Sequence, residues 1–409
     1  MKAGARNKMK KKCKNINLRD PERLIPAVKD VVFRHYRRYD FRNVLFHFGL
    51  SEDDYNEYFL TKNKALFDDC IRNIATECAR RIINRDLKLK PVIIREKLDK
   101  TTGKVRLIGK ESAMQQVFDY IVLHGSDEIF RRRFVSEQAS SIKGRGQVYG
   151  KEMIKDWIDA DNDALRYAAR HDVLYTRKCK YHVKIDIQKC YPSAKLEIFM
   201  SLFSKECANQ DLIWLYETLL RSHRVGGYTG FMIGSVISQN ACQYMLSFLY
   251  RYAKDLHYER RGKKYMSVSH MLLFLDDMLL MGSNRKELKS AVRSVARYAE
   301  KNLGFKIKPN WQIHDIDKDP IDMMGYVVFS DGHVEIRGRD FVKARRMLLR
   351  YYYQGNYLTL KQCQRICSYK GFFDHSDSKH AREIYHLKEV IEYASEKISR
   401  REKQCLIKK

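Results

Sequence analysis

Two adjacent aspartates, Asp276 and Asp277, lie between two apolar runs of strand-forming residues at 271–273 and 278–281. Unpaired carboxylates are costly to bury within a strand, so the pair predicts the tip of a β-hairpin. A divalent cation would explain why two like charges stand side by side. The alternative is a solvated Asp-Asp turn, which is the commoner origin of such a pair.

The elements around this pair indicate how a third carboxylate reaches it. A β-rich run at 181–187 carries Asp186 near its end, helices follow, and a helix predicted over 284–304 comes after the hairpin. This order is typical of a split β-α-β unit, in which the first strand and the hairpin lie side by side in an antiparallel sheet. We therefore expect Asp186 to lie next to Asp276 and Asp277.

Three converging carboxylates repel one another unless cations neutralise them. Carboxylate and main-chain oxygens suit Mg²⁺, which retains waters and binds substrate phosphates. Two such ions about 3.5–4 Å apart activate a hydroxyl and stabilise a leaving pyrophosphate in an in-line displacement. The chemistry indicated by the carboxylates is nucleotidyl transfer with two Mg²⁺ ions, with Mn²⁺ as the alternative metal.

The charge of the chain points to a polyanionic partner. Its 409 residues carry 79 Lys and Arg against 50 Asp and Glu, a formal net charge of +29, and nucleic acid is the leading candidate. No long apolar span, lipidation signal or signal peptide is visible, so we expect no membrane partner and a cytoplasmic location. The region 337–409 is itself basic, with 18 Lys and Arg against 8 Asp and Glu.

Five ordered segments carry a family resemblance. They are Lys184-Ile185-Asp186-Ile187-Gln188-Lys189-Cys190-Tyr191, Gly230-Phe231-Met232-Ile233-Gly234-Ser235-Val236-Ile237-Ser238-Gln239, Phe274-Leu275-Asp276-Asp277, Leu303-Gly304-Phe305-Lys306-Ile307-Lys308-Pro309-Asn310-Trp311 and Met323-Met324-Gly325-Tyr326. They resemble the successive palm motifs of bacterial reverse transcriptases, and residues 103–108 and 143–146 are similar to finger segments of that family.

The resemblance implies an α+β right-hand polymerase with fingers, a split β-α-β antiparallel-sheet palm and a helical thumb. The expected organisation has five parts: a flexible basic N-terminal arm over 1–24, an N-terminal helical region over 25–90, fingers over 91–180, a catalytic palm over 181–335, and a helical, basic thumb and tail over 336–409.

The resemblance also implies catalytic roles. Asp186 and Asp276 would bind both metals, Asp277 would be a weaker or indirect ligand, and the main-chain carbonyl of Ile187 would complete one coordination sphere. Lys308, in preference to Lys306, would protonate the leaving pyrophosphate.

Further residues would contact nucleotide or primer. Tyr191 matches the aromatic steric gate that selects deoxynucleotides, although a core tyrosine is the alternative. Gly234 would allow close backbone approach. The remaining expected contacts are Ile233, Ser238 and Gln239 around the nucleotide, Lys104 and Arg106 on the triphosphate, and Met324, Gly325 and Tyr326 as the primer grip. For each of the two cations a solvated surface charge is the alternative, and for the primer grip it is apolar strand packing.

Departures from the common pattern indicate a branch. Phe274 replaces the usual tyrosine, and Ile233 stands where many related polymerases carry glutamine. The Ile-Gly-x-x-x-Ser-Gln form resembles enzymes of diversity-generating retroelements, which copy a template RNA with frequent errors at adenine. The alternatives are a defence-associated, antiviral reverse transcriptase and a catalytically idle polymerase-like RNA-binding protein.

The expected partners follow from that resemblance. They are template RNA, the cDNA product, deoxynucleoside triphosphates, and a structured non-coding RNA or an accessory protein.

Overall fold

The computed structural model describes residues 10–99, 103–354 and 357–407, with side chains described as far as Arg401 except for that of Asp99. The chain divides into two compact units. The first comprises Met1–Val135, Ile187–Tyr252 and Ser294–Lys308, and the second comprises Ser136–Asp186, Ala253–Arg293 and Pro309–Lys409.

The first unit is mainly helical, with one antiparallel hairpin. Its elements are α1 (Pro21–His35), α2 (Tyr39–His47), α3 (Glu52–Thr61), η1 (Lys64–Phe67), α4 (Asp68–Ile83), β1 (Ile93–Asp99), β2 (Lys104–Lys110), α5 (Ala113–Gly125), α6 (Asp127–Arg133), α8 (Cys190–Ser193), α9 (Leu196–Glu206), α10 (Gln210–Arg221), most of α11 (Val236–Asp255), and η2 (Ala299–Leu303).

The second unit contains the largest sheet and a C-terminal helical group. Its elements are α7 (Gln147–Arg170), β3 (Tyr181–Asp186), β4 (His257–Arg260), β5 (Lys263–Met266), β6 (His270–Phe274), β7 (Asp277–Gly282), the first turns of α12 (Arg285–Tyr298), β8 (Ile313–Asp315), β9 (Ile321–Met323), β10 (Tyr326–Val328), β11 (Val334–Ile336), α13 (Gly338–Gln354), α14 (Leu360–Asp374), α15 (Lys379–Ile384) and α16 (Leu387–Ile407).

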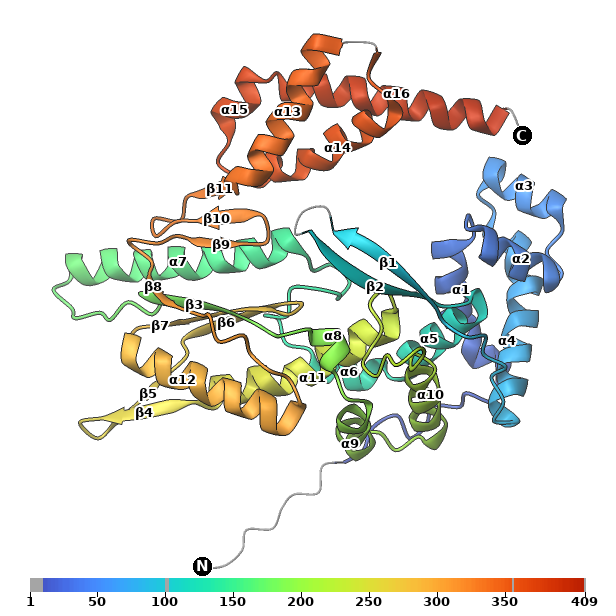
Figure 1. Cartoon of the computed structure of the whole chain (residues 1–409), viewed down its shortest axis with the longest axis horizontal. Coiled ribbons are helices and arrows are strands. Elements are labelled where there is room, and N and C mark those ends of the chain that lie inside the picture. The colour runs from blue at the N-terminus through green and yellow to red at the C-terminus, as the bar shows by residue number, and fades with distance from the viewer. Residues whose placement is uncertain (1–9, 100–102, 355–356, 408–409) are drawn as a thin grey trace, which may run out of the picture. The chain divides into compact units, whose positions relative to one another are not determined.

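The four-stranded sheet has the order β6-β7-β3-β8 and is antiparallel throughout. The first strand of the predicted split β-α-β unit therefore pairs with the second strand of the hairpin, as expected. Figure 1 shows α7 running along one face of this sheet, where Ile154 and Ile158 pack in the same buried cluster as Leu272 and Leu279. Leu272 and Leu279 are cross-strand partners, so their side chains share one face of the sheet.

Strand β7 explains why the apolar run after Asp277 does not alternate with polar residues. Its first residue is exposed, but the five that follow, Met278 to Gly282, are all buried. A strand covered on both faces reads as a continuous apolar run. The one exposed residue of β7 is therefore Asp277, where the strand begins.

The C-terminal helices α13, α14 and α16 pack around a second apolar cluster within the same unit. Its fully buried members include Ala344, Leu348, Cys363, Ile366 and Val390. The basic side chains of α13 lie on its outer surface. Arg345, Arg346 and Arg350 are all exposed.

The predicted flexible N-terminal arm is wrong for the residues that can be described. Lys12 forms a parallel bridge with Cys207, its N–H donates to the carbonyl of Glu206 at 2.6 Å, and Lys12 also pairs with Glu128 at 3.0 Å. Cys13 and Leu18 are each 3% exposed. Burial of these apolar side chains outweighs the repulsion expected among the lysines.

Over the described part of the chain, no helix is both long enough and apolar enough to cross a membrane. The nine described cysteines carry free thiols, and all but Cys367 are buried.

Candidate functional site

Three aspartates meet at one end of the four-stranded sheet. Asp186, the last residue of β3, is the cross-strand partner of Asp277, the first residue of β7. Asp277 is also paired with Phe274 across the hairpin, so Leu275 and Asp276 form a two-residue loop. The backbone register places the three residues at the same end of the sheet, with Asp277 in the strand and Asp276 in the loop.

The two-residue loop has an unusual backbone. Leu275 has a φ of 58°, in the left-handed region that costs a non-glycine residue roughly 1–3 kcal/mol. Its N–H donates to the hydroxyl of Ser140 at 2.7 Å. That hydrogen bond gives the main-chain N–H of Leu275 a partner and helps to stabilise the strained loop that contains Asp276.

A segment that sequence reasoning missed supports the hairpin from outside. Leu273 donates its N–H to the carbonyl of Glu137 at 2.9 Å and accepts from the N–H of Ala139 at 2.8 Å. Gln138 forms a parallel bridge with Leu273, and Gln138 is fully buried. The segment 137–140 therefore acts as a short extra strand against β6, and nothing in its sequence signals this pairing.

The carboxylates suit a divalent cation by their chemistry and exposure. Asp186 and Asp276 are half-buried and Asp277 is exposed. In the described ranges, no group of three or more His, Cys, Asp or Glu side chains is arranged to hold a metal ion. Mg²⁺ typically uses one or two protein carboxylates and takes its other ligands from waters and substrate phosphates.

The residues after Asp186 belong to the first unit and lead into α8. Ile187 is fully buried and faces Ile307 in an antiparallel bridge, and Gln188 donates its N–H to the carbonyl of Lys306 at 2.7 Å. Tyr191 lies in α8 and is half-buried. Tyr191 is therefore less buried than core tyrosines such as Tyr216 and Tyr244, which are fully buried.

The loop 230–234 packs closely against α8 and β2. The N–H of Phe231 donates to the carbonyl of Tyr191 at 2.8 Å, and the carbonyl of Ile233 accepts from Gly109 of β2 at 3.0 Å. A Cβ on Gly230 would lie 2.2 Å from the carbonyl oxygen of Pro192, so only glycine fits there. Gly234 has a φ of 102°, which also requires glycine.

Ser238, predicted to contact substrate, is fully buried at the start of α11. Its hydroxyl accepts the N–H of Met232 at 3.2 Å and lies 3.3 Å from Nδ1 of His223. Direct contact between this hydroxyl and a substrate is therefore a wrong expectation, because the protein surrounds it. Ile233 and Gln239 are half-buried and retain some exposed surface.

The finger residues Lys104 and Arg106 lie on β2, which pairs with β1 in an antiparallel hairpin. They are two residues apart and therefore project from the same face, and both are exposed. Their cross-strand partners are Asp99 and Lys97. The residues 100–102 of the expected finger turn lie outside the described residues.

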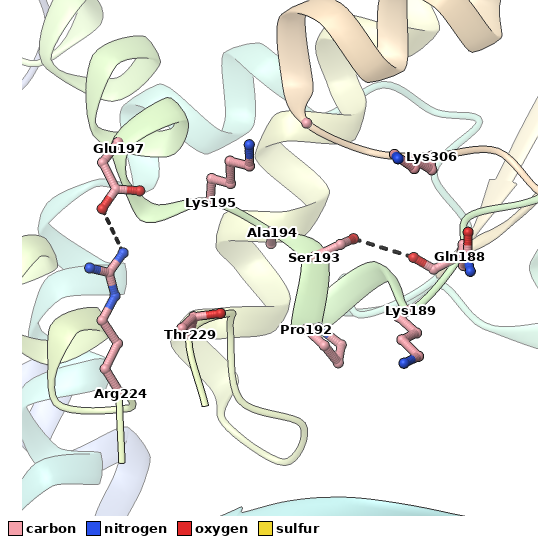
Figure 2. Close-up of a pocket in the computed structure, with 11 residues that line it drawn as sticks. Gln188, Lys189, Pro192, Ser193, Ala194, Lys195, Glu197, Arg224, Thr229 and Lys306 are labelled. Carbon is pink, nitrogen blue, oxygen red and sulfur yellow. Dashed lines mark hydrogen bonds and ion pairs between the residues drawn. The ribbon is translucent and has the colours of Figure 1, made fainter. Parts of the chain in front are cut away.

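A pocket of about 770 Å³ lies beside α8 within the first unit. It is lined by Gln188, Lys189, Pro192, Ser193, Ala194, Lys195, Glu197, Arg224, Thr229, Gly304 and Lys306. Figure 2 shows Arg224 paired with Glu197 on one side, at 2.6 Å, and Lys306 on the other. With four cations and one carboxylate on its wall, the pocket favours an anion.

Of the two candidate lysines, Lys306 is exposed and pairs with Glu300 at 3.7 Å, whereas Lys308 is half-buried. The expected primer-grip residues form a hairpin in the second unit, with Met324 and Gly325 in left-handed conformations between β9 and β10. Tyr326 is buried and donates its hydroxyl to the carbonyl of Gly371 at 3.3 Å.

No curated protein matches the sequence. Two similar solved structures are apo telomerase from Candida tropicalis and telomerase from Candida albicans in complex with a fragment of telomeric RNA, each at 11% identity and a TM-score of 0.40. The alignments cover 91% and 86% of this chain, and 84% and 76% of those chains.

The profile of one protein family, described as reverse transcriptase (RNA-dependent DNA polymerase), matches residues 98–328, which is more than half of the chain. The matched range contains the aspartates at the end of the sheet, α8 and the loop 230–234. The chain belongs to the reverse transcriptase family, the RNA-dependent DNA polymerases, and has the right-hand polymerase fold of that family.

Proposed function

We propose that this RNA-directed DNA polymerase performs nucleotidyl transfer at Asp186, Asp276 and Asp277 with two Mg²⁺ ions. Reverse transcriptases generally use divalent metal ions. The single observation that carries the proposal is the register of β3 and β7, which makes Asp186 and Asp277 direct neighbours. The carboxylates would hold the ions together with the carbonyl of Ile187, and the ions would stabilise the charge that develops on the phosphoryl group.

The protein's own groups would then select and orient the nucleotide. Tyr191 would exclude a ribose 2′-hydroxyl by contact with its ring. Lys104 and Arg106, exposed on one face of β2, would bind the triphosphate, and Lys308 would donate a proton to the leaving pyrophosphate. The cationic pocket beside α8 would attract the same anionic substrate.

Template and primer would bind along the basic surfaces. In the second unit, α13 carries exposed Arg345, Arg346 and Arg350, and Tyr353 on the same helix is 83% exposed. Arginine and exposed aromatic rings together suit a nucleic-acid backbone and its bases. The turn formed by Met324 and Gly325 would contact the primer end. A structured RNA or an accessory protein would bind the same basic surface.

The test uses the full chain on an RNA template annealed to a DNA primer. We expect incorporation of deoxynucleotides with Mg²⁺ or Mn²⁺ and none after chelation by EDTA. Binding of the duplex without incorporation, across varied templates and both metals, would instead support a catalytically idle RNA-binding protein.

We further infer a low-fidelity enzyme of the diversity-generating type. Ile233 is half-buried in a loop that is tied to both α8 and β2, and an aliphatic side chain there offers no polar contact to an incoming nucleotide. Loss of one hydrogen bond at a site of base selection reduces discrimination by roughly 1 kcal/mol, or about five-fold.

Sequencing of cDNA made on a defined RNA tests this inference. Errors should concentrate at template adenines and fall several-fold in Ile233→Gln, with Ile233→Val as a control for aliphatic packing. A uniformly low error rate at adenines in the unsubstituted protein would contradict the mutagenic role and favour the defence-associated alternative.

A further inference from the structure

A buried chain of polar groups runs from the end of β2 to the loop 230–234 within the first unit. Oε1 of Glu111 lies 2.7 Å from Nε2 of His223, and Nδ1 of His223 lies 3.3 Å from the hydroxyl of Ser238. Ser238 in turn accepts the N–H of Met232 at 3.2 Å. Glu111 is 3% exposed and the His223 and Ser238 side chains are fully buried.

The donors and acceptors of this chain match. A carboxylate only accepts hydrogen bonds, so Nε2–H of His223 donates to Glu111, and the hydroxyl of Ser238 bonds to Nδ1 on the other side of the ring. The Ser238 oxygen is then free to accept the main-chain N–H of Met232. Each group thus has a partner, which is what a buried polar network requires to be stabilising.

Asp119 adjoins Glu111 at the end of this network. Burial, together with the neighbouring Glu111 carboxylate, raises the pKa of Asp119 well above its usual value.

The chain acts on a segment that is otherwise held by main-chain hydrogen bonds, by the packed side chain of Met232, and by the hydroxyl of Tyr228, which donates to the carbonyl of Phe231 at 2.6 Å. Phe231 is tied to Tyr191 of α8, and Ile233 is tied to Gly109 of β2. Met232 stands between them, and its side chain is fully buried against Gly109, where an added Cβ would lie 2.1 Å from the Met232 side chain. The Ser238 hydroxyl is the side-chain contact that sets the middle residue of this segment.

We propose that His223 is a positioning residue for the polymerase reaction. Through Ser238 it holds Met232 and so sets the position of Ile233 and Gly234. This inference rests on the proposed role of these two residues beside the incoming nucleotide. Glu111 fixes the tautomer and orientation of the imidazole. His223 contacts no substrate itself, because it is fully buried.

Two substitutions separate the two hydrogen bonds of the imidazole. The amide of His223→Asn reaches the Nδ1 position and keeps the contact with Ser238, while the amide of His223→Gln reaches the Nε2 position and keeps the contact with Glu111. We expect His223→Gln to raise the KM for deoxynucleotides about five-fold with little change in kcat, and His223→Asn to stay within about two-fold of the unsubstituted protein.

A merely structural role gives a different pattern. Each variant loses one buried hydrogen bond, so the midpoint temperature of thermal unfolding should fall in both. Only His223→Gln should change the KM for deoxynucleotides. If KM is unchanged in both variants, or rises equally in both, the positioning role is wrong.

A second pair of variants covers the case in which His223 cannot be replaced without unfolding. Ser238→Ala removes the acceptor for Met232, and Ser238→Thr restores a hydroxyl. KM should rise in Ser238→Ala and recover in Ser238→Thr, and His223→Gln should add nothing to Ser238→Ala. Additive effects of the two substitutions would show that His223 does not act through Ser238.

The outcomes also distinguish this inference from the proposed function. Extension by the unsubstituted protein with no selective change in KM overturns only the inference. If the unsubstituted protein does not extend the primer at all, the proposed function is overturned. The variants are then compared by their affinity for a non-hydrolysable deoxynucleotide, measured on a primer–template whose primer ends in a dideoxynucleotide. Equal binding by all variants contradicts the positioning role.

Discussion

Two regions that the proposed chemistry depends on are held in place by different means. At the end of the four-stranded sheet, Asp186 and Asp277 are positioned by the hydrogen-bonded register of β3 and β7. In the first unit, the loop 230–234 is positioned by main-chain contacts and by the buried side chains of Ser238, His223 and Glu111. A backbone ladder tolerates many side chains, whereas a side-chain network depends on particular ones, so the loop should be the region more sensitive to distant substitution.

The largest effect should follow from removing a carboxylate at the end of the sheet. Asp186→Asn or Asp276→Asn should lower kcat for RNA-templated extension at least ~10³-fold, which is about 4 kcal/mol of transition-state stabilisation. Steady-state kinetics would measure this, with Asp315→Asn as the matched control, since Asp315 lies on β8 of the same sheet and pairs with Tyr181. If Asp276→Asn is as active as the control, the catalytic site does not include Asp276.

Tyr191 tests the first unit in a similar way. Tyr191→Ala should increase incorporation of ribonucleotides relative to deoxynucleotides by roughly 10–100-fold, because a ring that excludes the 2′-hydroxyl is lost. Tyr191→Phe keeps the ring and should retain selectivity. Competition between labelled dNTP and NTP measures the ratio, and an unchanged ratio in Tyr191→Ala would indicate a packing role.

Two buried histidines sharpen the comparison. His223 contacts a carboxylate, but His182 on β3 donates Nε2–H to the carbonyl of Asp319 at 2.8 Å, and burial lowers the pKa of His182 to about 4. The unfolded chain binds a proton near pH 6.5 that the folded chain does not, so the free energy of unfolding should fall as pH falls from about 6.5 toward 4.

The expected loss from His182 between pH 7 and pH 5 is roughly 2 kcal/mol. Urea unfolding at the two pH values would measure it, and His182→Gln should show a smaller difference. If the variant and the unsubstituted protein lose the same stability, acid sensitivity arises elsewhere in the molecule.

Ser140→Ala should have the smallest effect. It removes the hydrogen bond to the N–H of Leu275, worth about 1 kcal/mol, and so should lower kcat about five-fold without unfolding the protein. Ser136→Ala, at the serine directly before the segment 137–140, serves as the control. A kcat equal to that of the control would mean that the strained loop holds Asp276 without Ser140.

Local patterns in the sequence predicted the sheet well. The β-rich run and the Asp-Asp pair indicated β3, the hairpin and their pairing, and the helix predicted over 284–304 is present as α12 and η2. That helix ends at its predicted bound, Gly304, which adopts a φ of 72°.

The supports of both regions could not be predicted in this way. Ser140 lies 135 positions from Leu275, and Glu111 lies 112 positions from His223. Contacts over such separations leave no periodic signal, and a serine or a histidine in isolation has many roles. For the same reason the sequence did not predict that the lysine-rich N-terminal arm packs against the protein through Cys13 and Leu18.

The central claim, that Asp186 and Asp276 share a metal ion, is tested most directly by metal-directed cleavage. Fe²⁺ bound in place of Mg²⁺ generates hydroxyl radicals with peroxide and ascorbate, and these cut the backbone near the ion. Mapping the fragments should locate cuts close to Asp186 and at 275–277, suppressed by excess Mg²⁺ and lost in Asp276→Asn but not in Asp315→Asn. Cuts at other positions, or cuts near Asp186 that persist in Asp276→Asn, would contradict the shared site.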